Sequence, residues 1–282
     1  MISSALEQCP VCAHSQKKHL YSLSAGNLVS CQHCQLVLFV PRPSPEELAE
    51  FYNTEGYREG YEQSPMARQS FAIARYEQLE KAIAHYSPSL LSKANKRFLD
   101  IGCGLGDFLS VVAAQGWNIT GTEISPKAVQ QANSLLGDKV IEGEIINLEL
   151  PENSYDLITI YHVIEHLLDP VATLVKIRHL LKPEGMAFIE TPNMGSLGAR
   201  LRGKNWSHII PPEHITYFKP SSLNYALKEA GFPRCKVFTN PPPLIQSISH
   251  WPKPAQVMAT MIYQVAPLFN LGAALQAVAF KD

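Results

Sequence analysis

The sequence contains few charged residues. Only 17% of its 282 residues are Asp, Glu, Lys or Arg, the formal net charge is −1, and no stretch is dominated by Lys and Arg. A protein that binds nucleic acid usually presents a basic face, so this balance disfavours the steering of a polyanion by overall charge. Hydrophobic residues make up 46% of the chain, which indicates a sizeable folded core rather than disorder.

The sequence also lacks a secretion signal and an uninterrupted hydrophobic run. The first ten residues, MISSALEQCP, contain neither a positively charged segment nor an apolar segment, so we expect a cytoplasmic protein. Residues 254–280 carry no charge and are numerous enough to cross a bilayer, but Pro267 and Gly272 would break a single helix there. The same stretch contains the amide side chains of Gln256, Gln264, Asn270 and Gln276. We therefore expect no integral membrane span.

Cysteine is concentrated near the N-terminus. Four of the six cysteines form two C-x-x-C pairs, Cys9 with Cys12 and Cys31 with Cys34. This pattern is typical of a tetrahedral zinc site with four thiolate ligands. Two disulfides are the alternative, which a cytosolic setting disfavours. Four protein ligands leave no open coordination position, so the zinc would be structural.

The remaining cysteines and two nearby histidines are not needed for this site. His14 and His33 lie close enough in sequence to replace a ligand, but four thiolates already complete the coordination. Cys103 and Cys235 are far from both pairs, and we expect them to be small core residues.

Two further segments precede the main body of the chain. Residues 1–40 are expected to form the zinc-ribbon module, in which the apolar run 36–40 predicts a strand. Residues 41–95 are expected to form a helical connector. The Ser44–Pro45 pair is typical of a helix start, and apolar spacing over 66–86 predicts a second, longer helix.

From residue 97 onward, strand and helix patterns alternate, and residues 96–282 form the third predicted domain. Strands are expected within 97–101, 117–125, 139–144, 155–166, 186–193 and 235–239. Helices are expected within 106–116, 126–137, 170–185 and 221–232. This alternation predicts a parallel sheet with helices on both faces, and such sheets bind ligands at the carboxyl ends of their strands. A helical insertion is predicted over about 241–272.

A glycine-rich loop follows the first of these strands in RFLDIGCGLGDFL, residues 97–109. Gly102, Gly104 and Gly106 allow the backbone to turn sharply and to approach a ligand closely. Their spacing differs from the dinucleotide pattern G-x-G-x-x-G, and the sequence has no phosphate-binding G-x-x-x-x-G-K-[S/T] pattern. Glu123, at the end of the next strand, is placed to accept hydrogen bonds from ribose hydroxyls, which suits NAD and S-adenosylmethionine equally.

Together, four segments resemble the class I S-adenosylmethionine-dependent methyltransferases in order and spacing. They are FLDIGCGLGDFL, GTEIS, EGEIINLELPENSYDLITIYHVIEHLLDP and LLKPEGMAFIETPN, within residues 96–240. PPEHITYFKPSSLNYALKEAGF resembles a bacterial subgroup that acts on small molecules. CPVC…CQHCQLVLFVPRPSPEELAEFY resembles the zinc-ribbon leader of sugar C-methyltransferases, so the resemblance covers nearly the whole chain.

The resemblance implies an α/β fold, namely a Rossmann-like seven-stranded methyltransferase sheet with a small N-terminal zinc-ribbon module. In this family the seventh strand runs antiparallel to the others, and residues 275–280 would supply it here. The preceding segment is then expected to place a helical apolar stripe on the core. The stripe consists of residues 257, 258, 261, 262 and 265.

The resemblance also implies S-adenosyl-L-methionine as cofactor and assigns residues to it. Gly102, Gly104 and Gly106 would lie against its methionine and ribose parts. Asp100 would lie near the methionine ammonium group, and Glu123 would bind the ribose hydroxyls.

The other implied cofactor contacts follow later strands. Ile124 comes directly after the ribose-binding acid and is a further contact, while Glu144 and Ile145 would border the adenine. Tyr161 and His162, at the end of the fourth strand, would line the sulfonium and the substrate side.

Methyl transfer from a sulfonium needs alignment, and an acceptor that is a hydroxyl or a carbon acid also needs a base. The candidates are His166 in HVIEH, and Glu213 with His214 in PPEH, because both segments should reach the carboxyl edge of the sheet. The alternatives are that His166 only packs behind the cofactor and that Glu213 only orients its neighbours. Sugar C-methyltransferases carry a tyrosine two residues before the Glu-His pair, where this chain has Pro211.

The predicted function is therefore methyl transfer, at oxygen or carbon, to a small-molecule acceptor. A nucleotide-linked sugar, a lipid-like quinol precursor and another small hydroxyl compound all stay open as acceptors. A second hypothesis is an RNA methyltransferase whose ribbon grips nucleic acid, for which Lys17, Lys18 and Arg42 are the available basic residues. A third hypothesis is a protein that binds the cofactor without catalysis.

Overall fold

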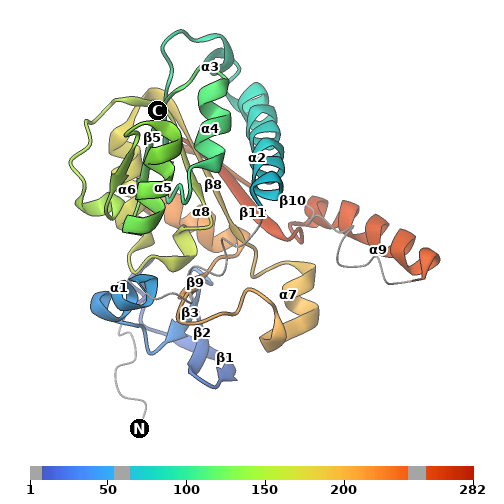
Figure 1. Cartoon of the computed structure of the whole chain (residues 1–282). Coiled ribbons are helices and arrows are strands. Elements are labelled where there is room, and N and C mark those ends of the chain that lie inside the picture. Colours follow the sequence, from blue (N-terminus) through green and yellow to red (C-terminus); the bar gives the residue numbers. More distant parts are fainter. Residues whose placement is uncertain (1–7, 54–63, 241–251) are drawn as a thin grey trace.

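The computed structural model describes residues 8–53, 64–240 and 252–282. Its larger part is an α/β body, and a small β-sheet lies below it in Figure 1. The body contains one seven-stranded sheet with the strand order β10-β11-β8-β7-β4-β5-β6. The strands are β4 (Arg97–Ile101), β5 (Asn118–Glu123), β6 (Val140–Glu142), β7 (Tyr155–Tyr161), β8 (Leu181–Pro192), β10 (Arg234–Asn240) and β11 (Ala274–Phe280).

The direction of the strands agrees with the expected methyltransferase sheet. The pairs β4 with β5, β4 with β7, β5 with β6 and β7 with β8 are parallel. The last strand, β11, lies between β8 and β10 and is antiparallel to both. The expected seven-stranded α/β fold, including its antiparallel final strand, is therefore confirmed.

Helices cover both faces of this sheet, as the alternating pattern predicts (Figure 1). Side chains of α6 and α8 pack in the hydrophobic cluster on one face, and those of α2, α4 and α5 pack in the cluster on the other. The helices are α2 (Pro65–Tyr86), α3 (Ser89–Ser92), α4 (Asp107–Ala114), α5 (Pro126–Leu136), α6 (Pro170–Leu180), α7 (Leu197–Arg202) and α8 (Pro220–Glu229).

Alternation along the strands sorts their side chains between the two clusters. In β4, Leu99 and Ile101 belong to the cluster with α6 and α8, whereas Phe98 belongs to the cluster with α2, α4 and α5. In β7, Ile158 belongs to the cluster with α6 and α8, and Leu157 belongs to the cluster with α2, α4 and α5. Successive strand residues point to opposite faces, so a sheet buried on both sides reads as a continuous apolar run.

The N-terminal part forms a second, antiparallel sheet of four strands in the order β1-β2-β3-β9. Three strands come from the cysteine-rich segment, namely β1 (Lys17–Leu23), β2 (Gly26–Cys31) and β3 (Val37–Val40). The fourth, β9 (Thr216–Tyr217), comes from the methyltransferase part of the sequence and pairs with β3. This shared sheet joins the two parts of the chain.

Helix α1 (Pro45–Asn53) follows β3 and begins at the predicted Ser-Pro pair. The Ser44 Oγ accepts a hydrogen bond from the Glu47 N–H at 3.2 Å, and the Glu47 carboxylate accepts one from the Ser44 N–H at 2.7 Å. This reciprocal pair is a capping box. It explains why the helix starts here.

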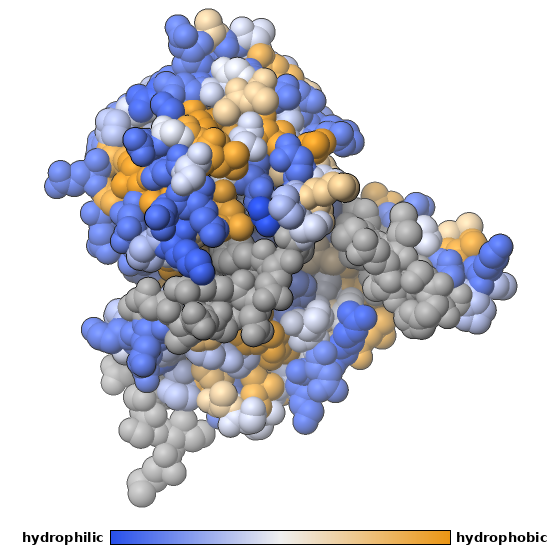
Figure 2. All heavy atoms as spheres, in the orientation of Figure 1, coloured by the Kyte–Doolittle hydropathy of each residue, from blue (hydrophilic) through white to orange (hydrophobic). Residues whose placement is uncertain are grey.

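The expectation for the apolar stripe at 257–265 is wrong. Helix α9 (Lys253–Val265) and the short 3₁₀ helix η5 (Ala266–Phe269) form in this region. However, α9 projects from the body (Figure 1), and the five stripe side chains are between 47% and 62% exposed. Figure 2 shows hydrophobic and hydrophilic residues side by side on this projecting segment. Helical spacing identifies an apolar face but not what covers it.

Helix α9 also bears on the membrane question. Among the described residues, no helix is both long enough and apolar enough to cross a bilayer.

Candidate active site

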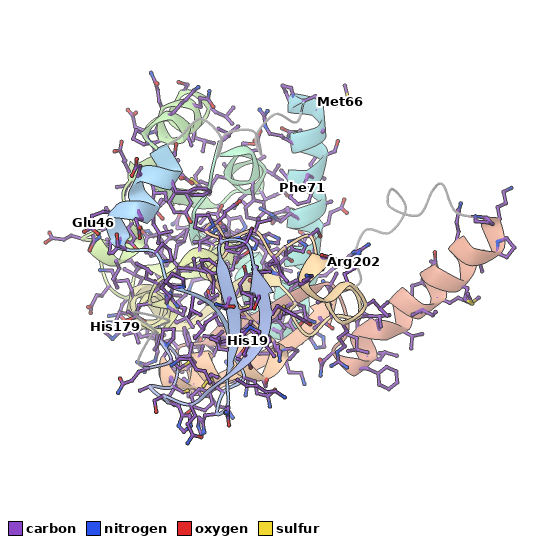
Figure 3. All side chains as sticks on the ribbon, turned by 90° about the horizontal axis from the view of Figure 1, so that it is seen from below. His19, Glu46, Met66, Phe71, His179 and Arg202 are labelled. Atoms are coloured by element: carbon purple, nitrogen blue, oxygen red, sulfur yellow. The ribbon has the colours of Figure 1, made fainter. Side chains whose placement is uncertain are left out.

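A cavity of about 570 Å³ opens at the carboxyl ends of the central strands, a size typical of small-molecule sites. One wall consists of the glycine loop, the end of β5 and residues 143–145. The rest of the lining comes from α1, α2 and residues 166–168. Seen from below in Figure 3, α1 with Glu46 and α2 with Met66 and Phe71 lie along the same side of the molecule. The N-terminal helices therefore complete the site.

The glycine loop adopts a backbone that requires glycine. Gly102, Gly104 and Gly106 have φ values of 71°, 55° and 82°, which L-residues with side chains rarely adopt. A Cβ on Gly102 would also lie 2.3 Å from Cγ2 of Val163. The Gly102 N–H donates to the Thr122 carbonyl at 2.8 Å, which holds the loop against the end of β5. Gly102 and Gly104 line the cavity, and Gly106 caps α4 just behind it.

The Glu123 carboxylate fixes the geometry of the same wall. Its Oε1 accepts from the N–H groups of Ile124 and Ser125 at 2.9 Å each, and its Oε2 accepts from the Gly104 N–H at 3.0 Å. A carboxylate has about four acceptor positions, so capacity remains for a ligand. Glu123, Ile124 and the neighbouring Glu144 and Ile145 line the cavity together.

Asp100 has its carboxyl group inside the protein, directly before the glycine loop. Its side chain is buried, its Oδ1 accepts a hydrogen bond from Thr159 Oγ1 at 2.6 Å, and it is not among the cavity-lining residues. Burial raises its pKa to about 7, although the Thr159 hydroxyl acts in the opposite direction. A direct contact with the methionine ammonium group therefore stays a prediction.

His162 forms a charged network at the end of β7. Its Nδ1 lies 3.3 Å from Glu165 Oε1 and its Nε2 lies 3.3 Å from Glu190 Oε1. Burial alone would lower its pKa, but the two carboxylates outweigh burial and raise the pKa to about 9. Burial likewise opposes ionisation of Glu165, yet His162 holds its pKa at about 2. The Thr191 hydroxyl also donates to Glu165 at 2.9 Å.

This network predicts a pH-dependent stability. Because the pKa of His162 is raised from 6.5 to about 9, its contribution is complete below pH 6.5 and is lost as the pH rises through 9. We expect His162→Gln to reduce the fall in unfolding free energy over this range, measured by urea denaturation at a series of pH values. His179→Gln, at an exposed position of α6, should keep the wild-type slope. An unchanged slope in His162→Gln would contradict the charged network.

Of the candidate bases, only His166 lines the cavity. Its Nδ1 donates to the Glu213 carbonyl at 2.8 Å, which leaves a lone pair on Nε2 when the ring is neutral. The buried His214 lies behind it, with ring centroids 4.8 Å apart, and its Nδ1 donates to the His208 carbonyl at 2.8 Å. Burial lowers the pKa of His214 to about 4. The catalytic roles stay predictions, but the two histidines differ in position, because His166 lines the cavity and His214 is buried behind it.

Comparison with known proteins identifies the family. Residues 71–233, more than half of the chain, match the family model described as a methyltransferase domain. The chain belongs to this methyltransferase family.

Curated relatives of the family cover the same region. The chain is 32% identical over 151 residues to a ubiquinone biosynthesis O-methyltransferase of Nitrosospira multiformis, covering 49% of this chain and 63% of the relative. It is 35% identical over 145 residues to one of Dechloromonas aromatica, covering 47% and 62%. The chain thus spans less than two thirds of the length of these relatives.

A solved structure supports the fold. A SAM-dependent methyltransferase from Archaeoglobus fulgidus has a TM-score of 0.52 and 22% identity, with 72% of this chain and 93% of that chain covered. At this identity, the likeness shows the shared methyltransferase fold alone.

Sequence reasoning missed the residues that α1 and α2 bring to the methyltransferase site. Arg75 of α2 lines the cavity with its guanidinium carbon 4.3 Å from the centroid of the Tyr161 ring. Arg68 pairs with Asp107 through a 2.9 Å contact between Nε and Oδ2. Tyr52 of α1 lines the same wall as His166. The helical pattern of 66–86 was the only signal, and it could not show which strand ends the helix would face.

The four N-terminal cysteines form one compact group. The Sγ atoms of Cys9 and Cys34 are 3.6 Å apart, those of Cys12 and Cys31 are 3.4 Å apart, and all four lie within 4.8 Å of one another. Tetrahedral zinc with Zn–S bonds of about 2.3 Å places its sulfurs ~3.8 Å apart. The four cysteines carry free thiols rather than disulfides. Glu165, His166 and His214 form a second group whose possible ligand atoms are equally close. In this group the Glu165 carboxylate already forms an ion pair with His162.

Proposed function

We propose that this protein transfers a methyl group from S-adenosyl-L-methionine to a hydroxyl oxygen of a small-molecule acceptor. The observation that carries the proposal is a single cavity that joins the glycine loop and Glu123 on one wall to the Nε2-bearing ring of His166 on the other. One wall can hold an adenosyl donor and the other can accept a proton.

The donor wall fits S-adenosyl-L-methionine by its chemistry. The Glu123 carboxylate suits the two ribose hydroxyls, and Glu144 and Ile145, which line the same cavity, would border the adenine. The guanidinium of Arg75 offers a partner for the donor's carboxylate within the same cavity. The donor supplies an activated methyl group, so the protein mainly aligns the donor and the acceptor.

The acceptor wall suits a hydroxyl group on an apolar or aromatic compound. Pro45, Leu48, Tyr52, Leu167 and Leu168 line the same cavity as His166. As the acceptor oxygen attacks the methyl carbon, His166 Nε2 takes the hydroxyl proton. The sulfur–methyl bond breaks with its electron pair staying on sulfur, so the products are the methyl ether and S-adenosylhomocysteine.

The acceptor that best fits this wall is a phenolic, quinol-type compound. The relatives are named for ubiquinone biosynthesis and O-methylation, and the apolar lining agrees with such an acceptor. The test is incubation of the protein with methyl-labelled donor and separate pools of phenols, nucleotide sugars and RNA. We expect label in a phenolic ether. Label only in RNA or only in sugars would overturn the proposal.

We also propose that Cys9, Cys12, Cys31 and Cys34 bind one structural zinc ion. The support is the size of the sulfur cluster and its cysteine-only composition. Four thiolates close the coordination sphere, so the zinc would hold the two C-x-x-C turns together rather than touch a substrate.

Metal analysis should therefore find one zinc per chain. Cys31→Ser should lose it and should unfold the N-terminal sheet, because binding energies of structural zinc reach about 10–16 kcal/mol. Cys235→Ser, at a half-buried cysteine remote from the cluster, should keep the metal and the melting temperature. Equal melting temperatures with and without a chelator would contradict a structural zinc.

A further inference from the structure

We propose that Arg42, at the end of the N-terminal sheet, is a positioning residue that holds the acceptor wall and its histidine in place. The expected effect of Arg42 on kcat rests on the proposed function, whereas its expected effect on the order of the neighbouring backbone does not. It gives the cysteine-rich module a role within the active site rather than a role in gripping nucleic acid.

The first observation is the contact of Arg42 with the loop after His166. Its Nη2 donates to the Leu167 carbonyl at 3.1 Å and to the Leu168 carbonyl at 2.9 Å. These two carbonyls belong to the residues that directly follow the 3₁₀ turn η3 (Ile164–His166). Leu167 and Leu168 line the cavity next to His166. Arg42 thus holds the backbone immediately after the turn that carries the proposed base.

The second observation is a chain of hydrogen bonds from the N-terminal sheet to the same turn. The Phe39 N–H of β3 donates to the Ile215 carbonyl at 3.1 Å, and the Ile215 N–H donates to the Glu165 carbonyl at 3.1 Å. The Thr216 hydroxyl adds bonds to the carbonyls of Glu165 at 3.0 Å and Ile164 at 3.2 Å. Backbone displacement of β3 would therefore displace η3.

The third observation is shared packing. Cys9, Cys31 and Cys34 lie in one hydrophobic cluster with Leu38 of β3 and Ile164 of η3. The cysteine cluster therefore anchors one end of β3, and Arg42 follows the other end. The N-terminal module therefore supports the acceptor wall from the cysteine cluster, through β3, to Arg42.

A guanidinium suits this position better than an ammonium. One terminal nitrogen of Arg42 reaches two successive carbonyls, and its rigid, planar donor geometry is retained when it is partly buried. Burial lowers the pKa of Arg42 to about 10, so it still carries its charge at neutral pH. Lysine can offer a positive charge but not the fixed geometry.

The test compares Arg42→Ala and Arg42→Lys with wild type. We expect Arg42→Ala to lower kcat about 10²-fold, since a displacement of about 1 Å costs that much, while the donor Kd stays within about twofold. Arg42→Lys should be intermediate, and low, non-denaturing concentrations of guanidinium ion should restore part of the Arg42→Ala rate. Arg234→Ala removes a cation that stacks on Phe280 at the sheet edge. This control variant should have the wild-type kcat and the wild-type donor Kd, and guanidinium ion should not raise its rate.

Hydrogen exchange separates this inference from the proposed function. Amides of residues 164–168 and 214–217 should exchange faster in Arg42→Ala than in wild type, while those of β4 and β5 should not change. This readout needs no methyl transfer, so it decides the inference even if no acceptor is found. Unchanged exchange in these segments, or an equal loss of donor affinity and kcat without guanidinium rescue, would overturn it.

Discussion

Replacing His166 by alanine is expected to lower kcat by about 10²–10⁴-fold, the usual contribution of a general base, without weakening donor binding. The reason is the position of the ring, which lines the cavity with Nδ1 bonded to the Glu213 carbonyl and Nε2 available for a proton. Initial rates with labelled donor would measure turnover, and calorimetry would measure donor affinity.

Two further variants show whether the loss belongs to His166. His19→Ala, at an exposed position of β1, should have wild-type kinetics. His214→Ala should reduce stability more than His166→Ala does, because it empties a buried site behind the cavity wall. If His166→Ala kept full turnover while a folded His214→Ala lost it, the base would be His214 and the geometric assignment would be wrong.

Replacing Glu123 by alanine is expected to weaken donor binding by about 10²–10⁴-fold. Hydrogen bonds to a charged group contribute about 1.5–3 kcal/mol each, and two ribose hydroxyls would lose their acceptor. The substitution also removes the acceptor of the Gly104 N–H, which shapes the glycine loop. Calorimetric titration with S-adenosylhomocysteine would measure the effect without turnover.

The matched control for this variant lies on the neighbouring strand. Glu142 of β6 pairs with Glu123 in the ladder but is exposed and does not line the cavity. Glu142→Gln should therefore bind the donor as wild type does. Donor affinity that survives Glu123→Ala in a folded protein would show that this carboxylate does not hold the ribose.

The fold from residue 97 onward was predictable because its signals are local. The central strands β4 and β7 are largely apolar and are bounded by Gly, Pro or polar residues, and β4 forms over the predicted residues. The strand β8 begins at Leu181 rather than at the predicted 186, because Leu181 already pairs with Tyr155 of β7. The Lys-Pro-Glu-Gly stretch is an irregularity in this pairing, which becomes regular from Met186 onward. Helix α9 forms within the predicted helical insertion, of which residues 241–251 lie outside the described part of the chain. Its exposed stripe depends on tertiary packing that periodicity does not report.

The two walls of the site differed in how far sequence could predict them. The donor wall consists mainly of one short glycine loop and of Glu123 at the end of the following strand. Because these residues are close in sequence, a motif identifies them. The acceptor wall is assembled from α1 and from η3 with the residues after it, and α2 adds Arg75 to the donor side. These side chains meet only through long-range docking. Arg75 lies in no motif, and Tyr52 ends the leader segment without any pattern that marks it as a site residue. His166 and His214 both follow a glutamate, and only their burial and position distinguish them.

Calorimetry on zinc-loaded protein is the most direct measurement of whether this cavity holds an adenosyl sulfonium donor. We expect saturable, one-to-one binding of S-adenosyl-L-methionine and of S-adenosylhomocysteine, with no measurable binding of NAD. Binding of NAD without binding of either adenosyl compound would contradict it.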